Sequence, residues 1–265
     1  MHKIALELGS FTIHWYGVFV GLGCLMGLWT ASRRGLLDRF APDKAYDVGL
    51  WILLGALIGA RTLYVTSYWE EEFASKSWLA VLNIRQGGLV FYGGFIGSCL
   101  AVILYCWLKR EPLWRLADML APSISLGSAF GRIGCLMTGC CYGKACSLPW
   151  GIHFPSDHPT FGTSVHPTQI YDSLINLAVY GGLEYAYRHK RFDGQIFALW
   201  LILYPIARSL TELFRGDYPQ RYIGGILTPA QLLSVGILAV GVVLYRFLPR
   251  RLSRVAPPTP ASASR

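Results

Sequence analysis

Charged side chains are scarce in this chain. Only 15% of its 265 residues are Asp, Glu, Lys or Arg, whereas 53% are hydrophobic. The mean hydropathy is +0.40. Soluble domains carry charge on about a quarter of their residues. The shortage therefore argues against a soluble protein and indicates an integral membrane protein.

Other patterns are missing too. The apolar runs lack the alternation of a membrane barrel and are long enough for helices. The net charge of +9 comes without a basic helix or interleaved aromatic and basic residues, so we exclude nucleic acid as a partner. The lack of internal repeats disfavours a transporter. No small-residue cleavage site follows the first apolar run, so we expect that run to be a retained span.

Seven apolar runs predict an all-α polytopic membrane protein with about seven transmembrane helices. They lie at 12–32, 46–68, 88–108, 116–138, 167–187, 194–214 and 229–248. The fourth run contains Asp118 and Pro122, so we expect it to be buried among other helices. Residues 1–250 are predicted to form a single transmembrane domain. The tail at 251–265 is rich in Pro, Ser and Ala and is expected to be disordered in the cytoplasm.

Basic residues follow every second run and define the expected orientation. They are Arg33, Arg34, Arg39 and Lys44 after the first run, Lys109, Arg110 and Arg115 after the third, Arg188, Lys190 and Arg191 after the fifth, and Arg246, Arg250, Arg251 and Arg254 after the seventh. The positive-inside rule then predicts that the N-terminus lies outside and the C-terminus in the cytoplasm. Residues 131–166 are accordingly expected at the outer face.

Three arginines lie inside apolar runs: Arg61, Arg132 and Arg208. A charge at such a place is costly and indicates a functional site. Glu212 is four residues after Arg208 and shares its helix face, so a structural ion pair is the alternative there. Because one glutamate cannot neutralise three arginines, we expect an anionic ligand. The planar guanidinium suits phosphate, and a phospholipid head group is the natural candidate.

A histidine and several glycines complete the candidate site. His166 precedes a proline at a predicted helix start, where it is either a general base or a residue bonded to the backbone. The glycine doublets at 87–88 and 93–94 would let a ligand approach the backbone closely, or they mark a helix start.

Four of the seven cysteines are clustered at the expected outer face, an oxidising compartment: Cys135, Cys140, Cys141 and Cys146. Their spacings do not match the CxxC knuckles of zinc sites, so we predict no metal and no other cofactor. The alternatives are a disulfide, whose pairing the spacing leaves open, and a metal site.

Motifs over nearly the whole chain resemble those of the phosphatidylglycerol–prolipoprotein diacylglyceryl transferases. They are His14-Trp15-Tyr16-Gly17, Gly59-Ala60-Arg61, Gly87-Gly88, Phe91-Tyr92-Gly93-Gly94, Asp118, Ala121-Pro122, Gly131-Arg132-Ile133-Gly134, Gly139, Gly143, Pro149-Trp150-Gly151, His166-Pro167-Thr168-Gln169-Ile170-Tyr171 and the segment from Arg208 to Arg215. They occur in the family's order, and the family also has seven spans with the N-terminus outside.

The resemblance implies an enzyme of the bacterial plasma (inner) membrane with its active site toward the periplasmic or outer face. It would transfer the diacylglyceryl group of phosphatidylglycerol to the lipobox cysteine thiol of a prolipoprotein signal peptide and release glycerol 1-phosphate. The implied catalytic residues are Arg132, Arg208, Tyr92, His166 and Glu212, with Glu212 orienting Arg208. The implied substrate-binding residues are Arg132, Arg61, Tyr16, Gly93, Gly94 and Gly143.

The chain departs from the family pattern at several polar positions. Cys135, Thr138 and Cys140 replace two asparagines and a glutamate, and Tyr92 replaces a histidine that is the proposed base. A tyrosine with a pKa of about 10 is a poor base at neutral pH, which leaves His166 as an alternative. The competing hypotheses are an enzyme on the same scaffold with another lipid or thiol substrate, and a non-catalytic phospholipid-binding protein.

Overall fold

Seven α-helices are present in the part of the chain that the structure describes, residues 4–8, 11–74, 78–83, 87–217 and 228–252 of a computed structural model. They are α1 (Trp15–Leu37), α2 (Lys44–Ser67), α3 (Phe91–Lys109), α4 (Leu113–Thr138), α5 (Thr168–Tyr187), α6 (Gln195–Glu212) and α7 (Pro229–Leu252). Each coincides with one predicted apolar run, with ends that differ by a few residues. The expected disordered tail lies outside the described residues from 253 onward.

Four of these helices are long and apolar enough to cross a membrane: α1, α2, α3 and residues 230–249 of α7. The other three carry buried polar side chains, among them Asp118 on α4, Asn176 on α5 and Glu212 on α6. The predicted number of seven spans and the predicted orientation of the termini therefore stay predictions.

The N-terminal segment corrects the all-α expectation. Strands β1 (Ile4–Leu8) and β2 (Phe11–His14) pair antiparallel, with Leu8 opposite Phe11. Residues 12–14 had been assigned to the first helical run because they directly precede its long apolar stretch. Two short helices, η1 (Trp69–Phe73) and η2 (Trp78–Leu82), lie between α2 and α3.

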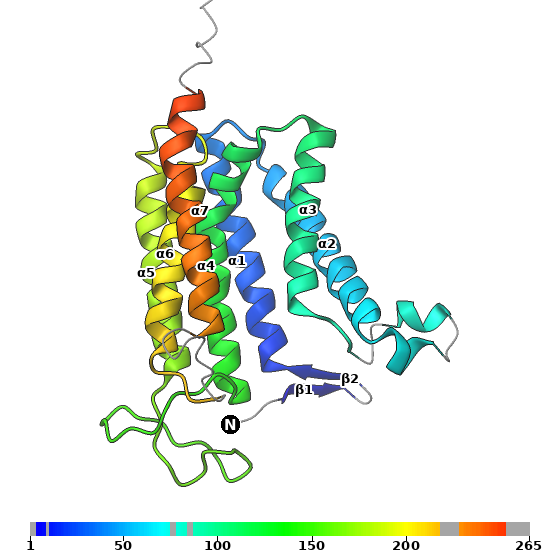
Figure 1. Cartoon of the computed structure of the whole chain (residues 1–265), viewed down its shortest axis with the longest axis vertical. Helices are drawn as coiled ribbons and strands as arrows, with labels where there is room; N and C mark the ends of the chain where they lie inside the picture. The colour runs from blue at the N-terminus through cyan, green and yellow to red at the C-terminus, as the bar shows by residue number, and fades with distance from the viewer. Residues whose placement is uncertain (1–3, 9–10, 75–77, 84–86, 218–227, 253–265) are drawn as a thin grey trace, which may run out of the picture. The chain divides into compact units, whose positions relative to one another are not determined.

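The chain divides into two compact units. Unit 1 contains Met1–Ala31 and Ala117–Arg265, and unit 2 contains Ser32–Leu116. In unit 1, α5 packs against α6 and α6 against α7, and Figure 1 shows α4 to α7 side by side. The first part of α1 packs against α4, where the Ser123 hydroxyl donates to the Gly27 carbonyl at 2.6 Å. The prediction of a single domain over 1–250 stays a prediction.

A buried carboxylate joins α4 to the start of α6. Asp118 is 0% exposed and accepts hydrogen bonds from the backbone N–H groups of Gly194 (2.8 Å), Ile196 (2.9 Å) and Phe197 (2.9 Å). The Lys190 ammonium lies 3.7 Å from the same carboxylate. The first N–H groups of a helix have no partner within the helix, so this carboxylate satisfies donors that would otherwise be buried and unpaired.

Glycines bring α2 and α3 of unit 2 into close contact. Gly55 and Gly59 on α2 face Gly93 and Gly97 on α3, and a Cβ on any of the four would collide with backbone of the other helix. Such stripes of small residues four apart allow helix backbones to approach closely in membranes. The close fit explains why Gly93 is buried, although the sequence had suggested a ligand contact there.

We predict that Gly59→Ala destabilises the protein. The added Cβ would meet the Gly93 carbonyl oxygen and the Gly97 Cα, and forcing α2 and α3 apart costs about 1–3 kcal/mol. Thermal unfolding of the purified protein in detergent measures the effect. Gly21→Ala on α1 is the matched control, because no heavy atom lies within 4 Å of a Cβ at that position. Equal unfolding temperatures for the two variants would contradict the prediction.

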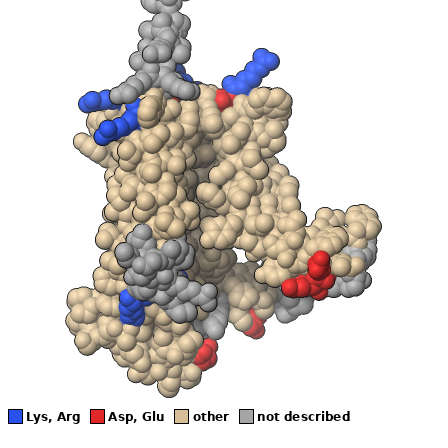
Figure 2. Space-filling model, in the orientation of Figure 1, with Lys and Arg blue, Asp and Glu red and all other residues tan. Residues whose placement is uncertain are grey.

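Many of the charged side chains lie near the ends of the helices of each unit. The sides of the helices carry few of them in the view of Figure 2. In unit 2, Lys44 at the start of α2 forms an ion pair of 2.6 Å with Glu111, which follows α3, so the two helices run antiparallel. Lys109 and Arg110 are exposed at that end, whereas Glu70 and Glu71 in η1 are exposed after the other end of α2.

Candidate functional site

Arg132 is oriented by a carboxylate of the neighbouring helix. Its Nε lies 2.7 Å from Asp172 Oδ2, and the other oxygen of Asp172 accepts a hydrogen bond of 3.0 Å from Asn176 Nδ2. The side chain of Arg132 remains 23% exposed, and that of Asp172 is 9% exposed. Because the pair uses Nε, the N–H groups of Nη1 and Nη2 stay outside it, and no described residue is bonded to them. Those groups form the fork that binds phosphate oxygens.

The partners of Arg132 correct one step of the sequence argument. The expectation of unmatched positive charge counted Glu212 and omitted Asp172. Asp172 and Asn176, four residues apart in one predicted helical run, were the available signal, because an ionisable residue among apolar helices usually has a partner. The case for an anion therefore rests on the donors left open on Arg132, and not on a missing countercharge.

Arg208 and Glu212 form an ion pair in the last turns of α6. Arg208 Nη1 lies 2.6 Å from Glu212 Oε2, and Glu212 is 1% exposed. The side chain of Arg208 is 16% exposed. A buried carboxylate at this distance fixes the guanidinium in one position. The pair fits both a structural ion pair and the orientation of Arg208 by Glu212, so the catalytic roles of the two residues stay predictions.

Arg61 is surrounded by backbone carbonyls of unit 2. Its Nε donates to Val81 O (2.7 Å), its Nη2 to Ala80 O (2.9 Å), and its Nη1 to Gly87 O and Gly88 O, both at 3.1 Å. Four of the five N–H groups of a guanidinium are thereby engaged. These contacts indicate that Arg61 shapes the segment between α2 and α3, and its binding of substrate stays a prediction.

The other predicted residues of unit 2 lie at the start of α3. Tyr92 is 64% exposed, Gly93 is in contact with α2, and Gly94 approaches the Ala56 carbonyl less closely. Their assignment to the substrate site stays a prediction.

Tyr16 brings α1 to the Arg132 region. It packs against Gly134 on α4, where an added Cβ would lie 3.1 Å from the Tyr16 ring, and it is 46% exposed. Tyr16 also lies within electrostatic range of Arg132 and of the thiols of Cys135, Cys140 and Cys141. The structure thus places two predicted site residues, Tyr16 and Arg132, beside a group of cysteines.

Gly143 lies in a tight backbone junction of the loop after α4. Its N–H donates to His166 O at 3.1 Å, it pairs with Arg215 in a β-bridge, and an added Cβ would meet the Cβ and carbonyl oxygen of His166 at 2.5 Å each. The Lys144 ammonium also donates to Leu213 O at the end of α6, at 3.0 Å. Gly143 therefore joins the loop to the end of α6, and its contact with substrate stays a prediction.

His166 lies in an aromatic cluster. Its Nδ1 is 3.4 Å from the Tyr171 hydroxyl, which accepts a hydrogen bond of 2.8 Å from Trp150 Nε1. The imidazole centroid is 5.3 Å from that of Phe214. These contacts orient the imidazole. Its role as a base stays a prediction.

Three thiols converge where α4 ends. The sulfur atoms of Cys135, Cys140 and Cys141 all lie within 4.8 Å of one another, and Cys146 is outside this group. All seven cysteines have free thiols in the structure. Hydrogen bonds from the Cys135 and Cys141 thiols lower the pKa of the Cys140 thiol below its ordinary value. The spacing had argued against a metal, but the turn brings the three sulfurs together.

The family model of the prolipoprotein diacylglyceryl transferases matches residues 3–247. The chain belongs to this family. A curated relative from Finegoldia magna is 34% identical over 92% of this chain and 94% of its own length, and one from Bacillus cytotoxicus is 34% identical over 92% and 90%. A relative from Clostridium tetani is 30% identical over 92% and 97%. All three are named phosphatidylglycerol–prolipoprotein diacylglyceryl transferase.

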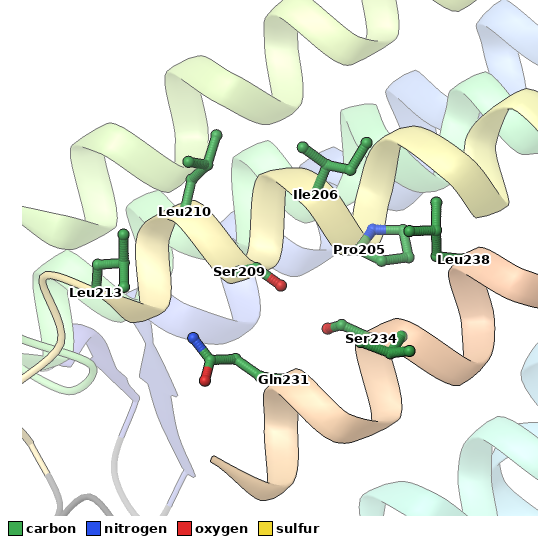
Figure 3. Close-up of a pocket in the computed structure, with 9 residues that line it drawn as sticks. Pro205, Ile206, Ser209, Leu210, Leu213, Gln231, Ser234 and Leu238 are labelled. Carbon is green, nitrogen blue, oxygen red and sulfur yellow. The ribbon is translucent and has the colours of Figure 1, made fainter. Parts of the chain in front are cut away.

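A groove of about 310 Å³ lies between α6 and α7 of this transferase family member (Figure 3). It is lined mainly by apolar side chains, with three polar ones: Ser209, Gln231 and Ser234. Figure 3 shows the ends of these three polar side chains directed into the space between the two helices. The groove contains none of the residues predicted for the site.

Proposed function

We propose that this chain transfers the diacylglyceryl group of phosphatidylglycerol to the thiol of a prolipoprotein lipobox cysteine and releases glycerol 1-phosphate. Membership of the family and the name shared by its curated relatives support this activity. The observation that carries the proposal is Arg132, which Asp172 holds through Nε while the two terminal nitrogens stay available. Arginine presented in this way suits the phosphate of the donor lipid.

The reaction explains why arginine is needed. The acceptor thiolate attacks the glycerol carbon that carries the phosphate, a C–S bond forms, and the electrons of the C–O bond leave with the phosphate oxygen. The phosphate thereby changes from a diester with one negative charge to a monoester with two. The Nη1 and Nη2 donors of an arginine that is already oriented interact more strongly with the phosphate in the transition state, where its negative charge grows, than in the bound lipid.

The groove between α6 and α7 supports a lipid substrate. Its apolar side chains suit a hydrocarbon chain, and α6 also carries Arg208, next in sequence to the groove residue Ser209. We assign the groove to one acyl chain of phosphatidylglycerol. The signal peptide is itself held in the membrane, so it would approach between helices from the bilayer.

We further propose seven spans in the bacterial plasma membrane, with the N-terminus outside and the Arg132 end facing outward. Arg188 and Arg191 are exposed just after α5, at the far end of that helix from Asp172, and the positive-inside rule assigns such an end to the cytoplasm. Labelling of single introduced cysteines with a membrane-impermeant reagent tests the orientation. Labelling of a cysteine at position 191 in intact cells would overturn it.

The activity is tested with purified protein, phosphatidylglycerol and a lipobox peptide. We expect a thioether-linked diacylglyceryl peptide and free glycerol phosphate in equal amounts. A folded protein that produces neither would overturn the proposal. Binding of phosphatidylglycerol without turnover would favour the non-catalytic lipid-binding protein, and turnover of a different lipid or thiol would favour another substrate on the same scaffold.

A further inference from the structure

The three converging thiols of unit 1 form a group with the composition of a metal site. Cys135 lies in the last turns of α4, and Cys140 and Cys141 follow in the turn after it. Their sulfur atoms are mutually within 4.8 Å, and Cys140 is exposed, so a ligand from solvent has access. Thiolates are soft ligands and select ions such as Zn²⁺.

Side chains of α5 fix the backbone of this turn. The Thr168 hydroxyl donates to Cys141 O at 2.6 Å, and Gln169 Nε2 donates to Cys140 O at 2.7 Å. Thr168 is 3% and Gln169 is 1% exposed. The Cys140 N–H in turn donates to Cys135 O at 3.1 Å. Ligands are held in position when a surrounding layer of buried hydrogen bonds fixes their backbone, and this turn has such a layer.

Cys141 also has an unfavourable backbone conformation. Its φ is +62°, in the left-handed region that non-glycine residues seldom adopt. Such a conformation costs on the order of 1–3 kcal/mol and persists where the surrounding structure imposes it, often at ligand sites. The left-handed backbone at Cys141 is part of the turn that brings the three sulfur atoms together.

We propose that Cys135, Cys140 and Cys141 bind one Zn²⁺-type ion through three thiolates and leave its fourth position for the acceptor thiol. The role at the fourth position rests on the proposed transferase function. In a tetrahedral site with Zn–S bonds of about 2.3 Å, the sulfurs lie about 3.8 Å apart, so the group needs to contract by no more than about 1 Å. Three protein ligands and one open position is the arrangement of catalytic zinc sites.

Residues near the three thiols link the proposed metal site to the side chains that we expect to bind the phosphate. Arg132 and Tyr16 both lie within electrostatic range of the thiols. Three thiolates and a divalent ion carry one net negative charge, which would lie within electrostatic range of the Arg132–Asp172 pair. The acceptor thiol and the donor phosphate would then be bound next to each other, which favours their reaction.

Metal binding would deprotonate the acceptor thiol, a step for which Tyr92 is poorly suited as a base. A thiol that coordinates Zn²⁺ loses its proton, here to solvent, and remains a nucleophile. Its electron pair forms the C–S bond to the glycerol carbon, and the C–O bond electrons leave with the phosphate. The ion returns to its starting state when the thioether product departs, so no oxidant or reductant is consumed.

Metal binding is tested first, without reference to turnover. The protein is stripped with a chelator, kept reduced with a phosphine, dialysed against Zn²⁺ or Co²⁺ and analysed for metal content. We expect one ion per chain and a thiolate-to-cobalt charge-transfer band. Cys135→Ser, Cys140→Ser and Cys141→Ser should each weaken binding by at least about 100-fold. Cys146→Ser, in the same loop but outside the group, is the matched control.

Either of two binding results would overturn the metal site: a reduced, folded wild type that binds neither ion stoichiometrically, or a triple serine variant that binds them as tightly as the wild type. A disulfide among the three cysteines that persists in the reductant would also overturn it.

The catalytic role is tested by the pH dependence of transfer by stripped and Zn²⁺-loaded enzyme. The stripped enzyme should be slower and should need a higher pH, because the free acceptor thiol has a pKa of about 8.5. Identical profiles would overturn the role at the fourth position while the metal site stands. Stoichiometric metal binding without transfer by either form would overturn the proposed function and leave the metal site in place.

Discussion

Arg132→Ala should lower the rate of diacylglyceryl transfer by about 10²- to 10³-fold, the usual cost of removing one donor that stabilises a developing oxyanion. The variant loses the two terminal nitrogens that Arg132 presents from its pair with Asp172. Because the phosphate gains negative charge during the reaction, the loss should fall mainly on kcat and less on KM. Initial rates with phosphatidylglycerol and a lipobox peptide measure both constants.

Two further variants interpret this result. Arg132→Lys keeps the charge but loses the fork and the Nε bond, so it should recover only a small part of the rate. Arg188→Ala removes an exposed arginine just after α5 and should transfer at the wild-type rate. If Arg132→Ala keeps more than a tenth of the wild-type rate while folded, Arg132 does not bind the reacting phosphate.

Asp118→Ala should destabilise the protein by about 3–5 kcal/mol, the largest effect on stability that we expect. The substitution leaves the N–H groups of Gly194, Ile196 and Phe197 buried without an acceptor and removes one of the carboxylates near the Lys190 ammonium. Thermal unfolding in detergent and the amount of folded protein in membranes both measure the loss.

Asp118→Asn should show a smaller loss, because one side-chain oxygen can still accept from the first turn of α6. Asp47→Ala, at an exposed position in the first turn of α2, is the control and should change the stability by less than about 1 kcal/mol. An Asp118→Ala protein that unfolds at the wild-type temperature would show that the hydrogen bonds accepted by Asp118 contribute little to the free energy of unfolding.

The helices were predictable from the sequence because each one is a long apolar run. The N-terminal hairpin was not, since β2 is only four residues long and is followed directly by the apolar run of α1. Pairing with β1 decides its conformation, and such pairing between segments is not visible in a pattern of local hydrophobicity.

The candidate site was predictable in its residues and less so in its contacts. Arg132, Arg208 and Glu212 stand out because charges in apolar runs are rare. The partnership of Arg132 with Asp172 was missed, because it depends on how α4 packs against α5. The convergence of the cysteines was missed for a similar reason, since it depends on the left-handed backbone at Cys141 and on bonds from Thr168 and Gln169.

The carboxylate of Asp118 also constrains the order in which the chain is assembled. Its three backbone donors lie 76 to 79 residues further along the chain. During synthesis, Asp118 therefore lacks these three partners until α5 and the first residues of α6 have been made. A chain truncated after α5 would leave Asp118 without the three backbone donors that it has in the folded protein.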